Sequence, residues 1–370
     1  MKNIKFVLRE IQLPFRFTFA HSRSSRREGA NIILEIHHPD GQVGYGETLY
    51  RSYLTGESFD SIVEDIKDFK NHLIEFDFLA SASPKPFLNE LYYRRKNLRN
   101  NASFCAFDLA VYDLHAKINN RSIASYFNAS RTEKLVTVPI GLNMPIILVV
   151  LIASFFGFRE FKIKVDDQSL DKTLFALKLL KILRLKFRLD ANEAWDDKTI
   201  VQALSRIPKS INSIEQPTEP NNFAACYSLV KNKNLKIRWV ADESIISLED
   251  AHSLMALDKN IVWNLRFAKN GGITGIQNLM DLANDNSVEY QLGVLVGETG
   301  LLASVLAFFS GITNCQHVEY GFNDFFLNHN PFKNPPLPIH GKSRWSDRKS
   351  GVFSRRKIDL NRLTTRTVEI

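Results

Sequence analysis

Three acidic residues recur at nearly equal spacing in the middle of the chain: Asp190, Glu215 and Asp242. Each stands at the end of a short apolar run, and the intervals of 25 and 27 residues each fit one strand–helix unit. In a (β/α)₈ barrel, successive strand ends meet at one rim, so the three carboxylates are predicted to surround one point. Oxygen ligands of this kind suit Mg²⁺, with Mn²⁺ as an alternative.

Two lysines precede these acids by one further unit. Lys162 and Lys164 alternate with Phe161, Ile163 and Val165, and period-two alternation turns both lysines into the barrel. A lysine beside a dication and a second lysine has its charged form disfavoured, which lowers its pKa towards a useful pH. The pattern predicts proton removal next to a metal-bound carboxylate, with Lys164 as the base and Lys162 as its electrostatic partner. Two lysines on a solvated edge would not have such apolar neighbours.

The acids also have a structural interpretation, because an Asp just after a strand often caps the next helix. Glu215 is a poor cap, and three such coincidences at barrel spacing argue against this alternative. Asn192 follows Asp190 by two residues on the same face and is expected to support a ligand or the base. Glu243 points the other way from Asp242, so it either supports the site or faces the helices.

These residues belong to a longer ordered series. The motifs are Lys162-x-Lys164, Asp190-Ala-Asn192, Glu215-Gln-Pro217, Ala241-Asp-Glu-Ser244, Lys269-Asn-Gly-Gly272 and Gly297-Glu-Thr299. Their order and spacing over nearly the whole chain resemble the enolase superfamily, in the mandelate racemase/muconate lactonizing enzyme branch. That branch includes muconate cycloisomerases, o-succinylbenzoate synthases and dipeptide epimerases. The resemblance implies a lysine base and Mg²⁺ that together form and stabilise an enediolate next to a carboxylate.

The chain departs from this family at the sixth barrel strand. The family pattern Asn-Ile-Lys-Leu, whose lysine is the second base, aligns with Asn264-Leu-Arg266-Phe. Arginine stays protonated, so Arg266 is expected to clamp the anionic end of the substrate or the developing enolate. Alternatively, it pairs with Glu298 or a metal-ligand carboxylate. Lys269 would replace the missing base only if its loop turned it inward.

The substitution favours one-base chemistry: elimination, cycloisomerisation, or a proton shift with retention. The alternative is a dipeptide (Ala-Glu type) or N-acyl amino acid epimerase or racemase. An alternative of another class is a catalytically inactive barrel that binds anionic partners.

Substrate contacts are expected from two loops, residues 17–29 and 47–57, and from Glu298 on the barrel rim. The candidates in these loops are Phe19, His21, Tyr50, Arg51 and Tyr53. Each could equally be ordinary surface. His21 and His317 are weak catalytic candidates, because no acid is spaced to orient either.

The chain is predicted to be a modified TIM barrel, (β/α)₇β, with an N-terminal α+β capping domain. Residues 1–128 form the capping domain, with strands at 4–13 and 31–37, a turn at 41–46 into a third strand, and helices at 58–73 and 103–116. Residues 129–334 form the barrel, and the tail 335–370 packs back on the capping domain. The barrel strands are expected at 136–141, 161–165, 187–190, 213–215, 239–242, 262–266, 289–292 and 316–319.

Composition sets the remaining expectations. The three cysteines are widely spaced without CxxC, and no secretory signal is visible, so we expect a cytoplasmic enzyme. The net charge of +8 accompanies no nucleic-acid-binding module, so nucleic acid is an unlikely partner and a small carboxylate substrate is expected. Residues 135–158 carry no charge, but prolines and polar residues interrupt them. We therefore expect no membrane span but a first barrel helix without a polar face, buried between subunits of a homo-oligomer.

Overall fold

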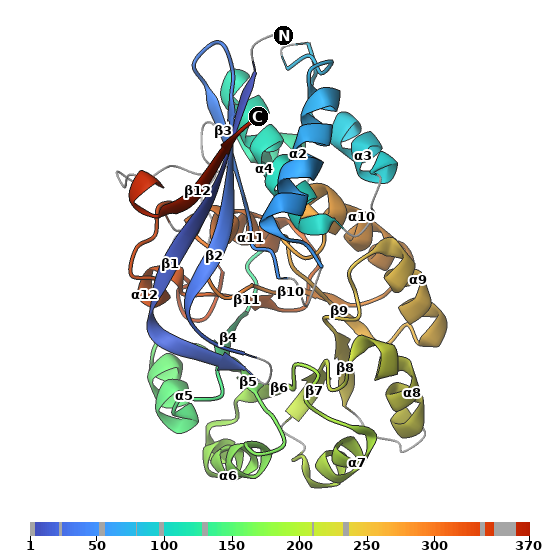
Figure 1. Cartoon of the computed structure of the whole chain (residues 1–370). Coiled ribbons are helices and arrows are strands. Elements are labelled where there is room, and N and C mark those ends of the chain that lie inside the picture. The colour runs from blue at the N-terminus through green and yellow to red at the C-terminus, as the bar shows by residue number, and fades with distance from the viewer. Residues whose placement is uncertain are drawn as a thin grey trace.

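The computed structural model describes residues 4–21, 24–51, 56–78, 80–95, 100–127, 132–208, 211–231, 237–333, 337–343 and 360–370 (Figure 1). The capping elements are β1 (Lys5–His21), β2 (Ser24–His37), β3 (Val43–Thr48), α2 (Phe59–Leu73), α3 (Lys85–Arg94), α4 (Asn101–Ile118), η1 (Ile123–Tyr126) and, at the end of the chain, η3 (Leu360–Arg362) and β12 (Thr364–Glu369). The barrel strands are β4 (Val136–Ile140), β5 (Glu160–Lys164), β6 (Lys186–Asp190), β7 (Ile211–Glu215), β8 (Arg238–Ala241), β9 (Val262–Leu265), β10 (Tyr290–Leu292) and β11 (Val318–Glu319). Between and after them lie α5 (Ile146–Phe155), α6 (Leu170–Leu180), η2 (Lys181–Leu183), α7 (Asp197–Arg206), α8 (Pro220–Lys231), α9 (Leu248–Leu257), α10 (Gly272–Asp285), α11 (Gly300–Ile312) and α12 (Asn323–Phe326).

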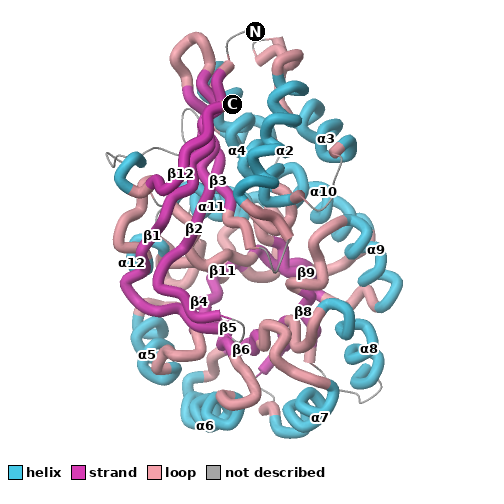
Figure 2. The backbone as a smooth tube through the Cα atoms, viewed as in Figure 1, coloured by secondary structure: helices cyan, strands magenta, loops and turns pink. Residues whose placement is uncertain are grey.

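Strands β4 to β11 pair in parallel and close into a barrel, with β10 and β11 completing the ring between β9 and β4. Seven strand–helix units precede the last strand, and the helices form an outer ring (Figure 2). The predicted (β/α)₇β barrel is confirmed. The strand ends differ from the predicted ones by one or two residues, as helix and strand boundaries commonly do.

Strand register brings the predicted site residues to one level of the barrel. Lys164 on β5 pairs with Asp190 on β6, and Asp190 pairs with Glu215 on β7. The apolar residues between them, such as Phe161 and Ile163, are fully buried against the outer helices. Alternation along β5 therefore anchors the strand on one side and presents the lysines on the other.

The capping sheet has the order β12-β1-β2-β3 and is antiparallel. The prediction of a loop at residues 17–29 is wrong. β1 extends to His21 and β2 begins at Ser24, so the two strands make a long hairpin. The register between them shifts between Pro14 and Phe19. In Figure 1 this hairpin descends from the capping sheet to the barrel beside β4 and β5.

Helix α4 packs on the capping sheet and is buried almost throughout. β3 permits this close approach because Gly44 and Gly46 face the helix. A Cβ added at Gly46 would lie 1.8 Å from the carbonyl oxygen of Ala106, and one at Gly44 would lie 2.3 Å from that of Ala110. Glycine is therefore required at both positions.

Two buried acids of the capping domain hold the amino ends of barrel helices. Glu47 of β3 accepts hydrogen bonds from the backbone N–H of Thr299 (2.8 Å) and from its hydroxyl (2.6 Å), at the start of α11. Asp108 of α4 accepts from the backbone N–H of Ile273 (2.7 Å), at the start of α10. A carboxylate at a helix amino end satisfies unpaired N–H groups and complements the helix dipole.

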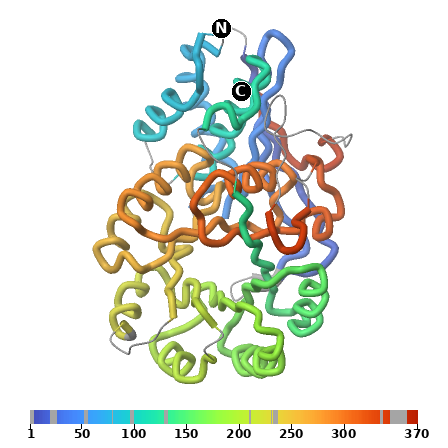
Figure 3. Tube along the Cα trace, turned by 180° about the vertical axis from the view of Figure 1, so that it is seen from behind, coloured from blue at the N-terminus to red at the C-terminus, as the bar shows by residue number. Residues whose placement is uncertain are grey.

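The end of the chain returns to both parts of the molecule. β12 joins the capping sheet beside β1, so the chain ends near the capping domain in Figures 1 and 3. Leu135, just before β4, forms an isolated bridge with Lys342. Segment 337–343 thus contacts the barrel, while 360–370 contacts the capping sheet.

α5 is the predicted first barrel helix without a polar face, and of its side chains only that of Val150 is buried. Within the described part of the chain, no helix combines the length and hydropathy that a membrane crossing requires.

Candidate active site

The three predicted metal ligands and both lysines meet inside the barrel rim. Asp190, Glu215 and Asp242 are essentially inaccessible, and Lys162 is buried. Lys162 Nζ lies 3.2 Å from Asp190 Oδ2 and 2.9 Å from Glu215 Oε1. The structure therefore brings these residues together, as their positions at successive strand ends predict.

Lys162 is the electrostatic centre of this group. Burial alone would lower its pKa, but Glu215, Glu319 and Asp190 together raise it above the ordinary lysine value. Glu319 Oε1 lies 2.5 Å from Lys162 Nζ. A lysine held in this way stays protonated and contributes a fixed positive charge beside the predicted metal ligands.

Opposing effects act on the carboxylates. Burial disfavours the charge of Asp190, but Lys164, Lys162 and Arg266 hold its pKa below the usual range. Asp242 likewise has a lowered pKa, because Arg266 and Lys269 outweigh its burial. For Glu215, burial and the neighbouring acids keep the pKa above its ordinary value despite Lys162.

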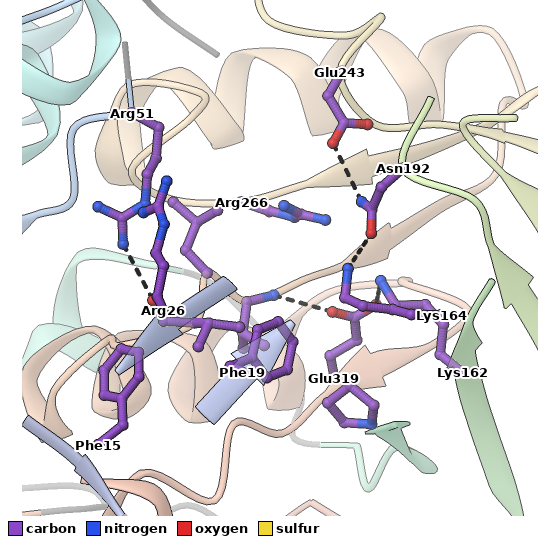
Figure 4. A pocket seen from close by; sticks show the side chains of 14 residues that line it. Phe15, Phe19, Arg26, Arg51, Lys162, Lys164, Asn192, Glu243, Arg266 and Glu319 are labelled. Atoms are coloured by element: carbon purple, nitrogen blue, oxygen red, sulfur yellow. Dashed lines mark hydrogen bonds and ion pairs between the residues drawn. The ribbon is translucent and has the colours of Figure 1, made fainter. Parts of the chain in front are cut away.

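Lys164 lines the cavity and begins a chain of polar contacts (Figure 4). Its Nζ lies 3.3 Å from Asp190 Oδ2 and donates to Asn192 Oδ1. Asn192 Nδ2 in turn lies 3.5 Å from Glu243 Oε1. Asn192 has a positive φ of 42°, a conformation that asparagine tolerates, and it turns its side chain between the lysine and the acid. Asn192 thus supports the predicted base, and Glu243 faces the cavity rather than the helices.

Arg266 contacts two of the predicted metal ligands. Its guanidinium forms a close ion pair with Asp242 and lies 3.5 Å from Glu215 Oε1. This arrangement corresponds to the alternative role, pairing with a ligand carboxylate. No substrate carboxylate is needed to account for its position.

Lys269 is fully buried beneath Asp242 and does not line the cavity. Its Nζ donates to Asp242 Oδ1 (2.8 Å) and to the backbone carbonyls of Asp242 and Asn264 (both 2.6 Å). Burial lowers its pKa despite Asp242. The loop does turn Lys269 inward, but towards the backbone and a ligand instead of towards the substrate space.

By their chemistry the three carboxylates fit the oxygen donor set of Mg²⁺. As they are arranged, no three His, Cys, Asp or Glu side chains among the described residues form a group that could hold a metal ion. Two buried cavity-lining atoms, Arg266 Nε and Glu243 Oε2, have no hydrogen-bond partner in the described ranges. Buried polar atoms of this kind indicate a polar ligand. The donor set thus fits Mg²⁺ in kind, and in this structure Lys162, Lys164 and Arg266 pair with its carboxylates.

The capping domain closes the cavity with the β1–β2 hairpin. Phe19 lines it, with its ring centroid 5.8 Å from Lys164 Nζ. Arg51 also lines it and donates to the carbonyl of Val296 (3.2 Å) on the barrel side. His21 ends β1, and nothing is described of its side chain.

The remaining predicted contact residues lie elsewhere. Tyr50 donates to Glu10 Oε1 (2.6 Å) within the capping sheet and is not among the cavity-lining residues. Glu298 is buried behind the rim, where it accepts from the backbone N–H of Leu295 (2.8 Å); burial raises its pKa to about 8. Tyr53 lies outside the described residues. The expectation that no acid orients His317 is wrong, because its Nδ1 lies 2.6 Å from Glu160 Oε2. Neither His317 nor Glu160 lines the cavity.

Several cavity residues were missed by sequence reasoning, among them Glu319, Arg26 and Phe15. Glu319 ends the eighth barrel strand, so the strand-end argument that found Asp190 would also have found it. Arg26 and Phe15 line the cavity from the hairpin. Their position depends on pairing between distant segments, which no local pattern reveals.

The cavity is predominantly cationic. Its lining has five basic side chains, from Arg26, Arg51, Lys162, Lys164 and Arg266, and two acids, Glu243 and Glu319. Asp190, Glu215 and Asp242 lie behind this lining and pair with three of the five basic groups. Burial and Asp242 raise the pKa of Glu243 to about 8, which weakens its negative charge at neutral pH. Such a site attracts an anion and provides a lysine beside it.

Known proteins are similar to this chain in sequence and in fold. The enolase C-terminal domain-like family matches residues 153–352, more than half of the chain. The L-Ala-D/L-Glu epimerase of Francisella tularensis subsp. novicida is 26% identical over 345 residues, covering 89% of this chain and 94% of the epimerase.

Two solved structures share the whole architecture. A dipeptide epimerase from Cytophaga hutchinsonii, complexed with Mg and the dipeptide D-Ala-L-Val, aligns over 99% of both chains with a TM-score of 0.83 and 20% identity. A muconate lactonizing enzyme from Pseudomonas fluorescens, complexed with muconolactone, aligns over 97% of this chain and 98% of its own with a TM-score of 0.84 and 21% identity. The chain therefore belongs to the enolase superfamily, in the mandelate racemase/muconate lactonizing enzyme branch, and is an isomerase or lyase of that superfamily.

Proposed function

We propose that this enzyme removes the proton α to the carboxylate of a small substrate, with Lys164 as the base. The observation that carries the proposal is the register of Lys164 with Asp190 and Glu215 at the end of three adjacent strands. A base on one strand and carboxylate ligands on the next two can serve the same substrate carboxylate. Catalytic groups at the carboxyl ends of barrel strands are the rule in this fold.

Each residue of the site has a distinct task in this proposal. Asp190, Glu215 and Asp242 would hold Mg²⁺, which when bound supplies charge that stabilises the negative charge developing on the substrate carboxylate. Lys164 in its neutral form accepts the α-proton, and Asn192 fixes the direction of its amine. Lys162 remains protonated and adds a second positive charge.

The substrate class follows from the relatives and the cavity. We propose a dipeptide or an N-acyl amino acid, because a sequence relative is an L-Ala-D/L-Glu epimerase and more basic than acidic side chains line the cavity. This favours epimerisation, the alternative in our sequence analysis, over the muconate-type reaction. Only the C-terminal residue of a dipeptide has its α-proton next to a free carboxylate, so the reaction is expected there.

A second candidate, one-base elimination or cycloisomerisation, rests on Arg266. An epimerase needs a proton donor on the face opposite Lys164, and a guanidinium stays protonated in this pH range. The close ion pair with Asp242 also stabilises the charged form of Arg266. The stereochemistry of proton exchange separates the two candidates.

Calorimetric titration with Mg²⁺ tests the metal part of the proposal. The wild-type protein is expected to bind Mg²⁺, and Asp242→Asn to bind it at least about tenfold more weakly, since one charged oxygen ligand is lost. Asp60→Asn, which changes an exposed acid paired with Arg366, serves as the control and should bind like wild type. Equal binding by Asp242→Asn, or none by wild type, would overturn the assignment.

A further inference from the structure

The outer face of the barrel carries two exposed apolar stripes on neighbouring helices. On α5, Leu148, Leu151, Ile152 and Phe155 follow the i, i+3, i+4, i+7 spacing of one helix face and are 48–87% exposed. This pattern normally marks the face that packs on a core, yet here it points away from the barrel.

α6 and η2 continue the same surface. Phe175, Leu179 and Ile182 follow i, i+4, i+7 spacing and are 54–85% exposed. α5 and α6 contact each other and lie side by side at the barrel edge in Figures 1 and 2. We call this surface the α5–α6 face. It comprises Ile147, Leu148, Leu151, Ile152, Phe155, Phe156, Phe175, Leu179, Ile182 and Leu183.

The size of this face suits a protein interface. If each large side chain offers about 200 Å², these exposures leave roughly 1,000 Å² of apolar surface. Monomeric proteins rarely expose more than about 300–600 Å² in one patch. A standard interface buries about 800 Å² per partner.

Acidic and basic side chains lie at opposite ends of α6. Asp166 and Asp167 lie just before its amino end, and in its first turn Lys172 follows Asp171, which pairs with Arg206. Lys178 lies in its last turn, and Lys181 and Arg184 lie in and after η2. Among the described residues, these three basic groups have no carboxylate partner within ion-pair distance. Burial raises the pKa of Asp167, and the negative charges of Asp196 and Asp166 raise it further. Asp166 and Asp167 at one end, and the three basic groups at the other, would each gain from a partner of the opposite sign.

We propose that the α5–α6 face is the interface of a homodimer. A two-fold axis perpendicular to the helices runs α6 antiparallel to its mate. The acidic end of each α6 then lies level with the basic end of the other, and the apolar stripes pack between them. A two-fold interface requires such self-complementarity. The proposal is independent of the reaction that the barrel catalyses.

The same charge separation distinguishes a second copy from a lipid surface. An anionic membrane would attract Lys178, Lys181 and Arg184 but repel the acidic end of the same helix. A copy of the chain satisfies both ends at once. A second copy of the chain, related by a two-fold axis, therefore matches both the apolar side chains and the charges of the α5–α6 face.

Sedimentation velocity of the full chain over a range of concentrations tests this directly. Wild type is expected to be a dimer or a larger even oligomer. The double variant Leu151→Glu/Phe175→Glu should raise the dimer dissociation constant at least about 100-fold, because it places unpaired carboxylates inside an apolar interface. Leu229→Glu/Ile74→Glu, which changes two side chains exposed elsewhere, is the matched control and should sediment like wild type. Thermal melts check that both variants remain folded.

Charge reversal tests the two-fold geometry. Asp167→Lys and Arg184→Glu should each weaken the dimer, and the combined variant should recover at least part of the loss. Amide exchange without any variant gives a second readout: peptides from α5 and α6 should become protected as protein concentration rises.

Three results would overturn the proposal. One is a wild-type monomer throughout the concentration range. Another is an oligomer that Leu151→Glu/Phe175→Glu leaves intact. The third is a monomer that cosediments with vesicles of phosphatidylcholine and phosphatidylglycerol but not with phosphatidylcholine alone, which would assign the face to a lipid surface instead.

Discussion

Arg266 occupies the position where the family pattern has a second lysine, and it changes the charge of the site as well as its acid–base chemistry. The guanidinium contacts Asp242 and Glu215, so it neutralises the carboxylates that would bind Mg²⁺. It also lines the cavity with Lys164. If it were free of these carboxylates, the guanidinium could clamp an anionic group of the substrate with two parallel hydrogen bonds.

Replacing Arg266 with Met separates these two effects. We predict that kcat/KM falls more than about tenfold, because a hydrogen bond to a charged group contributes about 1.5–3 kcal/mol. Mg²⁺ should bind at least as tightly, because a competing positive charge beside Asp242 is gone. Steady-state kinetics measures kcat/KM, and calorimetry measures the affinity for Mg²⁺. Unchanged turnover would show that Arg266 only balances charge.

Arg266→Lys tests whether this residue selects the reaction. We predict that the variant gains exchange of the α-proton on the face opposite Lys164, because a lysine amine can release and accept a proton at reachable pH. Proton NMR in D₂O with both configurations of a substrate measures the gain. If exchange stays confined to one face, the shape of the pocket sets the stereochemistry, and the identity of residue 266 does not.

At the scale of elements, the sequence predicted the barrel strands and most residues at the barrel rim. It did not predict how the hairpin of the capping domain reaches the cavity. Asp190, Glu215 and Lys164 could be found because each ends a short buried strand and parallel register then sets their level. The hairpin that brings Phe19 and Arg26 to the cavity depends on pairing across a register shift, and its residues resemble an ordinary polar loop. Arg266 and Lys269 could be placed near the site, but their acceptors depend on side-chain packing that spacing does not encode.

The packing of α4 on β3 gives a prediction at this scale. Gly46→Ala would place a methyl group on the carbonyl of Ala106, and neither the buried helix nor the paired strand can move without losing other contacts. We predict a loss of at least about 2 kcal/mol in the free energy of unfolding. Urea denaturation measures it. Glu64→Ala, at an exposed position on α2, is the control; an equal effect in both variants would refute the role of the glycine.

At the scale of the molecule, the capping domain and the barrel are joined through buried carboxylates at helix ends. Burial raises the pKa of Glu47 to about 7, although Thr299 and Asn31 donate to it. The folded state then holds more protons than the unfolded state between about pH 4.5 and 7. The free energy of unfolding is therefore expected to fall as pH rises through this window and to level off above it.

Glu47→Gln should reduce this slope, because the amide does not titrate. It should also lower stability by about 1–3 kcal/mol, since one acceptor for the start of α11 is replaced by a donor. Thermal melts from pH 5 to 8 measure both effects. Asp108 has a pKa raised to about 7 as well, so Glu47→Gln should keep a residual slope. A slope identical to that of wild type would exclude Glu47 as a titrating group.

The central claim is that Lys164 removes an α-proton next to a carboxylate, and deuterium incorporation tests it most directly. Proton NMR in D₂O with Mg²⁺ would follow a panel of dipeptides and N-acyl amino acids with wild type, Lys164→Ala and the surface control Lys259→Ala. We predict that wild type and Lys259→Ala exchange the α-proton of the C-terminal residue of at least one substrate. Lys164→Ala should lose exchange on the face of that lysine by about 10²–10⁴-fold, the range typical of a general base. Undiminished exchange at that face in Lys164→Ala, or no exchange by wild type across the panel, would contradict the account.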